Sequence, residues 1–238
     1  MENNRPFEIL SPYERWVPTQ EQLVQSDYEK LLPPLVHKIR EAVSKWRDSG
    51  YAGASGTSKS LLRYWFDSLH KVNDNPFRFF FSQQEAIESI IYLYETARAQ
   101  NKYELMKFDS SNRISTGMFD ETWPRYVIKM ATGSGKTKVM ALALAWSYFH
   151  KLYEENSSLS KNILIIAPNI IVLNRLRKDF DNFRIFREEP FIPDIRIKAG
   201  KLKKVPKVKK TKMNWKNYEK RQTISTVKHR PTRPWYLS

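Results

Sequence analysis

A glycine-containing loop between an apolar segment and a long helical pattern constrains this chain more than any other feature. The loop reads Met130-Ala-Thr-Gly-Ser-Gly-Lys-Thr137. It matches the pattern G-x-x-x-x-G-K-[ST], except that Met130 replaces the first glycine. The short apolar segment Arg125–Met130 precedes it, and apolar residues follow at helical spacing from Lys136 to about Glu154. The sequence therefore predicts a strand, a tight turn and a helix in that order.

The residue types in this loop suit a phosphate group. Gly133 and Gly135 allow backbone N–H groups to turn toward phosphate oxygens, and the dipole of the following helix adds positive potential. In such loops the lysine, here Lys136, reaches the β and γ phosphates, and the hydroxyl of Thr137 binds Mg²⁺. We therefore predict a site for ATP, with Mg²⁺ held by Thr137 through the nucleotide. Its residues are Met130, Ala131, Thr132, Gly133, Ser134, Gly135, Lys136 and Thr137.

After the loop, the pattern alternates between strand and helix. The apolar run Asn162–Ala167 predicts a strand that is covered on both faces, and Pro168 ends it. Ile170–Phe180 predicts a helix, and Arg184–Phe186 predicts the start of a third strand. This order is typical of an α/β fold with a parallel sheet, flanking helices and right-handed crossovers.

The residues before the loop predict helices. The apolar spacing of Tyr28–Trp46 and of about Ser58–His70 predicts two helices in a packing module over residues 1–76. A third helix is predicted over Ser82–Ala99, where Ser82 suits the N-cap and Glu85 completes a capping box. The polar, aperiodic stretch Asn101–Thr122 predicts a long loop.

The glycine loop and two other segments resemble the motifs of superfamily two helicases and translocases. The loop resembles their motif I, and Met130 resembles the branch that holds type I and type III restriction motor subunits and nucleotide-excision-repair helicase-like proteins. The segment Phe80–Ile87 is similar to the Q-type motif, in which a glutamine reads the adenine edge. Gln83 is the matching position, and an amide can pair with both the donor and the acceptor of adenine. Phe80 stands where the family often has an arginine.

The third segment, Ile163–Asn169, resembles motif Ia, which closes a strand and contacts the nucleic-acid backbone. The positions that the resemblance assigns to DNA contact are Ala167, Pro168 and Asn169.

The resemblance covers about residues 77–194 and implies a partial RecA-like P-loop NTPase domain. A helical region, 1–76, precedes this domain, and a basic tail that we predict to be disordered, 195–238, follows it. The implied function is the ATP-binding N-terminal part of a DNA helicase or translocase of the type III restriction Res-subunit kind. ATP and Mg²⁺ are the implied cofactors, and DNA and a modification (methyltransferase) subunit are the implied partners.

The acidic motif of such motors does not follow the third segment. Motor ATPases use Asp-Glu-x-[Asp/His] after a buried strand, where the aspartate orients Mg²⁺ and the glutamate activates water. Neither Glu188-Glu189 nor Asp179 and Asp181 follows an adequate strand, and Asp120-Glu121 precedes the loop. No residue is therefore assigned a catalytic role. The chain resembles a helicase truncated before this Walker B motif and before the second motor domain, and we expect it to be inactive alone.

Charge is concentrated in the tail. Residues 195–238 hold 15 Lys and Arg residues against one acid, Glu219, whereas residues 1–194 hold 26 against 24 acids. Two alternatives to a motor fragment follow. The chain could be a non-catalytic, nucleotide-gated DNA-binding module that uses the tail, or a frameshift near Asp194 could have produced an inert fragment.

Other classes of protein are excluded by composition. The absence of cysteine excludes disulfides and cysteine-ligated zinc. The four histidines are scattered, and none has a second ligand at metal spacing. The longest apolar runs are far shorter than the roughly 20 residues of a membrane span, and no signal peptide is visible. We therefore expect a cytoplasmic protein without a membrane partner.

Overall fold

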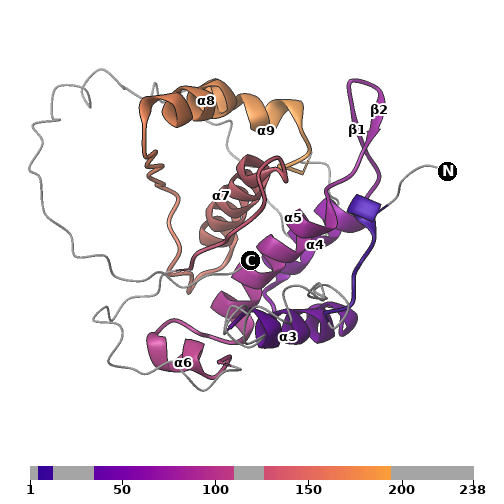
Figure 1. The fold of residues 1–238 in the computed structure, drawn as a ribbon, viewed down its shortest axis with the longest axis vertical. Helices are drawn as coiled ribbons and strands as arrows, with labels where there is room; N and C mark the ends of the chain where they lie inside the picture. The colour runs from indigo at the N-terminus through magenta and orange to yellow at the C-terminus, as the bar shows by residue number, and fades with distance from the viewer. Residues whose placement is uncertain (1–4, 13–34, 110–125, 194–238) are drawn as a thin grey trace, which may run out of the picture. The chain divides into compact units, whose positions relative to one another are not determined.

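Helices dominate the part of the chain that the computed structural model describes, residues 5–12, 35–109 and 126–193 (Figure 1). One antiparallel hairpin accompanies them, formed by β1 (His70–Val72) and β2 (Asn75–Phe77). The helices are η1 (Arg5–Phe7), α3 (Val36–Asp48), α4 (Gly56–Asp67), α5 (Phe81–Ile91), η2 (Tyr92–Thr96, a π-helical turn), α6 (Lys102–Met106), α7 (Lys136–Tyr153), α8 (Ile170–Phe180), η4 (Asp181–Phe183, a 3-10 turn) and α9 (Arg184–Glu188).

The first two long helices, α3 and α4, confirm most of the predicted apolar faces, but α4 ends at Asp67 instead of near His70, and Leu69 is 100% exposed. Helix α3 buries Val36, Ile39, Val43 and Trp46, which recur every three or four residues and so lie on one face of the helix. Helix α4 begins two residues before the predicted start, because the side chain of Ser55 caps it by accepting a hydrogen bond from the N–H of Ser58 at 3.1 Å. Residues 28–34 of the first predicted helix lie outside the described residues.

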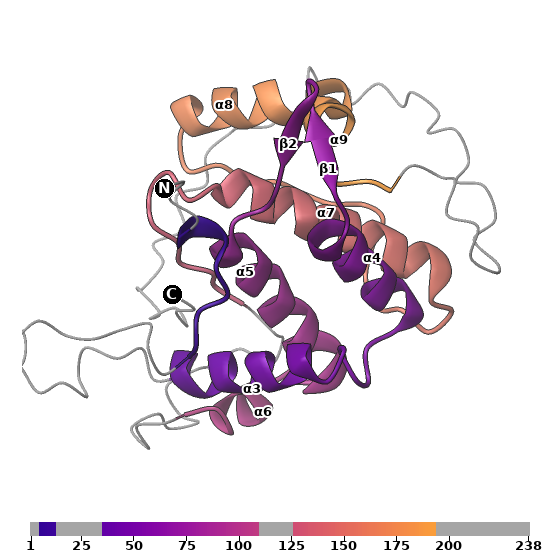
Figure 2. The same cartoon turned by 90° about the vertical axis from the view of Figure 1, so that its right-hand side faces the viewer.

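Helix α5 is the element that the other long helices share. It packs against α3, α4 and α7 (Figure 2). Its Ile87 and Ile91 are fully buried, as is Leu142 of α7. Helix α7 has 18 residues, yet no helix in the described ranges combines the length and apolarity that a membrane crossing requires.

A buried ion pair fastens α3 to α5. The guanidinium of Arg47 donates from Nε to both carboxylate oxygens of Glu88 at 3.0 Å and makes a further short contact through its Nη2 atom. The Tyr51 hydroxyl and the Gln84 amide each donate to Glu88 Oε1 at 2.8 Å. Burial would lower the pKa of Arg47, but its contacts with Glu88 raise it above the ordinary value. Glu88 thus satisfies donors from three segments with one carboxylate.

A second acidic side chain, Glu95 in the turn η2, supports the start of α4. Its Oε2 accepts from the N–H of Ser55 at 2.7 Å, and its Oε1 lies 3.0 Å from Nε2 of His150 on α7. Burial alone would raise the pKa of Glu95, but the hydrogen bonds from His150, Ser58 and Ser55 hold it below the ordinary value. A carboxylate at a helix N-terminus stabilises that helix through its dipole.

The predicted cap of α5 is wrong in its register. The helix begins at Phe81, one residue before the predicted Ser82 cap, and Gln83 rather than Glu85 returns to the N-cap. The Oε1 atom of Gln83 accepts from the N–H of Phe80 at 3.0 Å. Glu85 is instead buried and lies 3.4 Å from the Nε atom of Arg40. A glutamine in the first turn can close a cap as well as a glutamate does.

Two features of the described chain were not predicted from the sequence. The predicted loop Asn101–Thr122 begins with helix α6, which Asn101 caps by accepting from the N–H of Glu104 at 3.0 Å. The hairpin β1–β2 extends beyond α4 and α5 in both views (Figures 1 and 2). Its turn residues Asn73 and Asp74 have φ of 50° and 62°, as a two-residue hairpin turn of type I′ requires.

The predicted parallel sheet is not present in residues 5–12, 35–109 and 126–193. Residues 126–130 carry one isolated bridge, at Ile128, and residues 162–167 have no regular structure. Leu164 and Ile166 are 66% and 81% exposed instead of buried on both faces. The predicted third strand, Arg184–Phe186, is part of helix α9. An apolar segment forms a buried strand only beside other strands, and the described chain provides none for these segments.

Candidate functional site

The glycine loop has the backbone shape that its sequence predicted. Gly133 and Gly135 have φ of +84° and +86°, a left-handed conformation that residues with a Cβ atom rarely adopt. Helix α7 begins at the next residue, Lys136, with Gly135 as its N-cap. The N–H groups at the start of a helix lack the carbonyl partners one turn earlier that later N–H groups have, although here the N–H of Lys138 donates to the carbonyl oxygen of Gly135 at 2.8 Å. The loop therefore places these donors at the positive end of an 18-residue helix.

Two side chains of the loop donate hydrogen bonds to the same backbone carbonyl group. The Lys136 ammonium donates to the carbonyl oxygen of Ala131 at 3.1 Å, and the Ser134 hydroxyl donates to the same oxygen at 2.7 Å. Lys136 is exposed. Its bond to a neutral carbonyl is weaker than a bond to a charged oxygen, so an incoming phosphate would compete for the ammonium.

Gln83 forms one wall of the loop. Its Nε2 atom donates to the carbonyl oxygen of Ser134 at 2.9 Å, while its Oε1 atom accepts from the N–H of Phe80. The residue is 2% exposed. A Cβ atom added to Gly135 would lie only 2.2 Å from the Nε2 atom of Gln83. A glycine is therefore required at position 135 both by the backbone angle and by the amide behind it.

Thr137 lies in the first turn of α7 and is partly buried. Within the described ranges, no group of three or more His, Asp or Glu side chains could hold a metal ion by itself. Mg²⁺ at this position would depend on oxygens of the nucleotide in addition to the hydroxyl of Thr137.

The structure adds Lys138 and Glu189 to this site, and sequence reasoning overlooked both. The Lys138 ammonium lies 2.7 Å from Oε2 of Glu189 and 4.6 Å from the centre of the Phe77 ring. Glu189 appeared in the sequence only as half of an unsuitable acidic pair. The sequence did contain one indication, the second lysine of Gly-Lys-Thr-Lys138. A cation in the first turn of a helix is disfavoured by the helix dipole, so its presence there suggests a nearby anion.

The segment that resembles motif Ia is placed on the surface. Pro168 and Asn169 are exposed, and Ala167 is partly buried. Asn169 caps α8, because its Oδ1 atom accepts from the N–H of Val172 at 3.0 Å. Helix α8 spans the predicted residues, Ile170–Phe180. In Figure 1, the α8–α9 segment runs from this cap back to the start of α7, where Glu189 meets Lys138.

Comparison with known proteins gives one family. The model of the family described as "Type III restriction enzyme, res subunit" matches residues 77–230, which include Gln83, the glycine loop and α8. No curated protein and no solved structure matches the chain. The family match extends past Asp194 into the basic tail.

Proposed function

Because this chain belongs to the family of type III restriction enzyme res subunits, we propose that it is the ATP-binding part of a DNA helicase or translocase. A RecA-like P-loop fold is characteristic of this helicase-like family, and its members act on DNA. For this chain, the proposal depends on one observation above all. Gly133 and Gly135 hold left-handed angles directly before α7, with Lys136 as the first residue of that helix.

The residues of the loop suit the binding of a nucleoside triphosphate. The left-handed glycines leave the loop without the Cβ atoms that would keep phosphate oxygens from the backbone. We assign the Lys136 ammonium to the β and γ phosphates and the Thr137 hydroxyl to Mg²⁺. Bound ATP would supply the phosphoanhydride bond, and the chain's own groups would bind and orient it.

We assign Gln83 to the adenine edge as well as to the loop. A glutamine amide has two N–H donors and an oxygen that can accept two hydrogen bonds. One donor is used by Ser134 and one acceptor position by Phe80. The second donor and the second acceptor position are the pair that an adenine edge requires.

Lys136→Ala should abolish nucleotide-dependent stabilisation. A ligand that binds only the native state at 100 times its Kd stabilises it by about 2.7 kcal/mol. We expect Mg-ATP to raise the melting temperature of the unaltered protein and to leave that of Lys136→Ala unchanged. Lys178→Ala removes an equal charge from an exposed position on α8 and should keep the full shift. Equal shifts in all three proteins would remove the assignment of the site.

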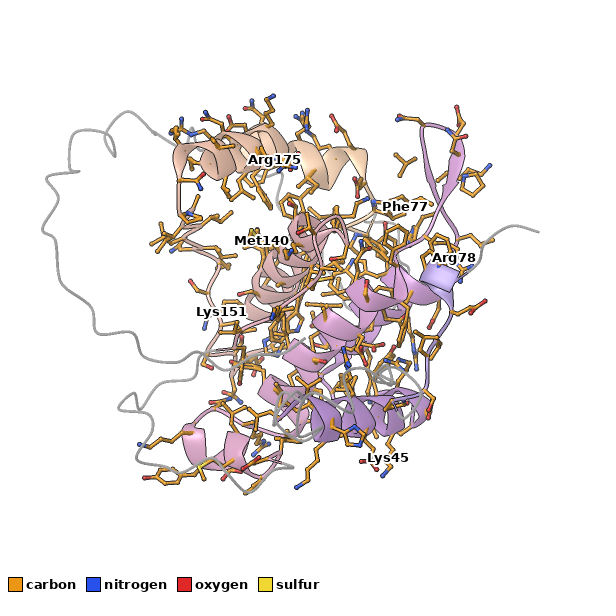
Figure 3. All side chains as sticks on the ribbon, in the orientation of Figure 1. Lys45, Phe77, Arg78, Met140, Lys151 and Arg175 are labelled. Carbon is orange, nitrogen blue, oxygen red and sulfur yellow. The ribbon has the colours of Figure 1, made fainter. Side chains whose placement is uncertain are left out.

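We propose two contacts with DNA. Asn169 offers its amide NH₂ group to a backbone phosphate while its oxygen caps α8, and the neighbouring Ala167 and Pro168 shape the same exposed turn. Arg175 is exposed on the helix that follows (Figure 3). The larger contribution comes from residues 195–238, whose 15 Lys and Arg residues oppose one acid. A modification subunit with methyltransferase activity is the protein partner that we propose.

Deleting residues 195–238 should flatten the salt dependence of DNA binding. Each phosphate that a protein neutralises on duplex DNA contributes about −0.9 to the slope of log K against log salt. We expect a steep slope for the full chain and a shallow one for the deletion, measured by fluorescence anisotropy with labelled duplex at several salt concentrations. If both proteins show the same slope and affinity, the described helices rather than the tail carry the contact.

A non-catalytic, nucleotide-gated DNA-binding module is the second candidate function. It is favoured by the basic residues 195–238, in which 15 Lys and Arg residues oppose one acid. Measuring ATP hydrolysis by this chain with and without DNA separates the two. A motor domain hydrolyses ATP faster when DNA is present, whereas a gated module binds ATP and DNA without turnover.

A further inference from the structure

Lys138 is a cation at a position that disfavours cations. It lies in the first turn of α7, at the positive end of the helix dipole and only two residues after Lys136. A lysine in this position raises the local positive potential, and therefore its natural partner is an anion. In the structure that anion is Glu189, whose Oε2 atom lies 2.7 Å from the Lys138 ammonium.

The side chain of Lys138 passes along the glycine loop. Its Cδ atom would lie 3.8 Å from a Cβ atom built on Gly135, and the ammonium is two bonds further along the chain. The ammonium also lies over the face of Phe77, 4.6 Å from the ring centre. Lys138 thus borders the loop on the side of Gln83, whose amide approaches the same Gly135 position.

Glu189 is held beside α7 by the residues that follow it. Phe191 is fully buried and stacks at a tilt against Phe79 with ring centres 5.5 Å apart. Its N–H donates to the carbonyl oxygen of Glu189 at 2.8 Å, and its own carbonyl accepts from the indole N–H of Trp65 at 2.9 Å. The backbone of Glu189 is anchored, while its side chain is 23% exposed.

We propose that Lys138 is a second cation for the triphosphate, which Glu189 holds at the side of the loop until a nucleotide binds. This inference rests on the ATP site proposed above. A triphosphate carries several negative charges where Glu189 carries one, and ion pairs that are partly open to water are weak. The ammonium therefore gains by moving from the carboxylate to the phosphates. Since residues two apart lie about 200° apart around a helix, Lys136 and Lys138 approach the loop from opposite sides.

The test is a cycle of Lys138→Met, Glu189→Gln and the double variant, with ATP affinity measured by titration calorimetry. We expect Lys138→Met to weaken binding about tenfold, as the loss of one charge-assisted contact does. Glu189→Gln should strengthen binding by about threefold or more, because it frees Lys138 and removes a like charge. In the Lys138→Met background, most of that gain should disappear. Lys178→Met, which removes the same charge from exposed α8, should change the affinity little.

Two results would overturn the inference while leaving the ATP site intact. One is unchanged affinity in Lys138→Met when Lys136→Ala binds no ATP. The other is an equal gain from Glu189→Gln in both backgrounds, which would show that the carboxylate acts only through its charge at a distance. If Lys136→Ala binds ATP as tightly as the unaltered protein, the proposed site itself is wrong, and the role of Lys138 falls with it. Melting curves without nucleotide confirm that each variant is folded.

Discussion

Glu88→Ala should lower the free energy of unfolding by about 3–5 kcal/mol, the usual effect of breaking a buried ion pair by removing one partner. The Glu88 side chain is 0% exposed and that of Arg47 is 8% exposed, so water cannot replace the lost carboxylate. The variant would leave a buried guanidinium without its counter-charge and the Tyr51 hydroxyl without its acceptor. A domain is typically stable by only about 5–15 kcal/mol. The loss should appear in urea denaturation as a much lower midpoint.

The matched control for this prediction is Glu104→Ala. Glu104 in α6 pairs with Lys107, the C-cap of that helix, and the side chains are 34% and 68% exposed, respectively. Such surface pairs contribute at most about 1 kcal/mol. A shift for Glu88→Ala no larger than that of Glu104→Ala would show that the Arg47–Glu88 pair does not hold α3 against α5.

Gly135→Ala should disrupt the loop more than Gly133→Ala, although both glycines have nearly the same φ. A left-handed angle costs a residue with a Cβ atom roughly 1–2 kcal/mol. At Gly133 no atom lies within 4 Å of the added Cβ, whereas at Gly135 the Gln83 Nε2 atom lies at 2.2 Å. We expect Gly133→Ala to show only the conformational cost. Gly135→Ala should show that cost, a clash with Gln83 and the loss of detectable ATP binding.

A double variant isolates the clash. Gln83→Ala removes the amide that the new Cβ would meet, so Gly135→Ala should destabilise the protein less in that background than in the unaltered chain. The interaction free energy from this cycle measures the clash, with urea denaturation as the measurement in the absence of nucleotide. Additive effects of the two substitutions would show that the loop moves away from Gln83 without cost.

Local chemistry made the glycine loop and its helix predictable. Two glycines followed by Lys-Thr, an apolar segment before them and an amphipathic pattern after them together determined the turn and α7. Helix α8 was predictable for a similar reason, since asparagine is favoured at the N-cap position that Asn169 occupies. These elements depend mainly on residues close to them in sequence.

The predicted strands show the limit of this reasoning. An apolar run such as Asn162–Ala167 is a strand only if neighbouring strands supply its hydrogen bonds, and no local pattern states whether they are present. Arg184–Phe186 was too short to distinguish a strand from a helix. The structure extends it into α9, with Ile185 buried and Glu189 beside Lys138.

The hydrogen-bond partners of polar residues could also not be predicted from the sequence where they lie far apart along the chain. The spacing of Ser82 and Glu85 matched a capping box, but the side chain that closes the cap belongs to Gln83. Gln83 was assigned to adenine by resemblance, and its bond to Ser134 joins residues that are 51 positions apart. A sequence pattern can predict that a side-chain amide lies at the start of a helix, but not which distant carbonyl group accepts its hydrogen bond.

The bond between Gln83 and Ser134 has a consequence for the order of folding. Helix α7 can form by itself on a timescale of about a microsecond, because its hydrogen bonds are local. The loop before it gains its contact with Gln83 only when α5 arrives, since the amide that meets Ser134 belongs to α5. Contacts between such distant positions close late, after the loss of chain entropy that they require. Gln83 therefore joins the proposed nucleotide site only during tertiary assembly, after the local hydrogen bonds of α7 can form.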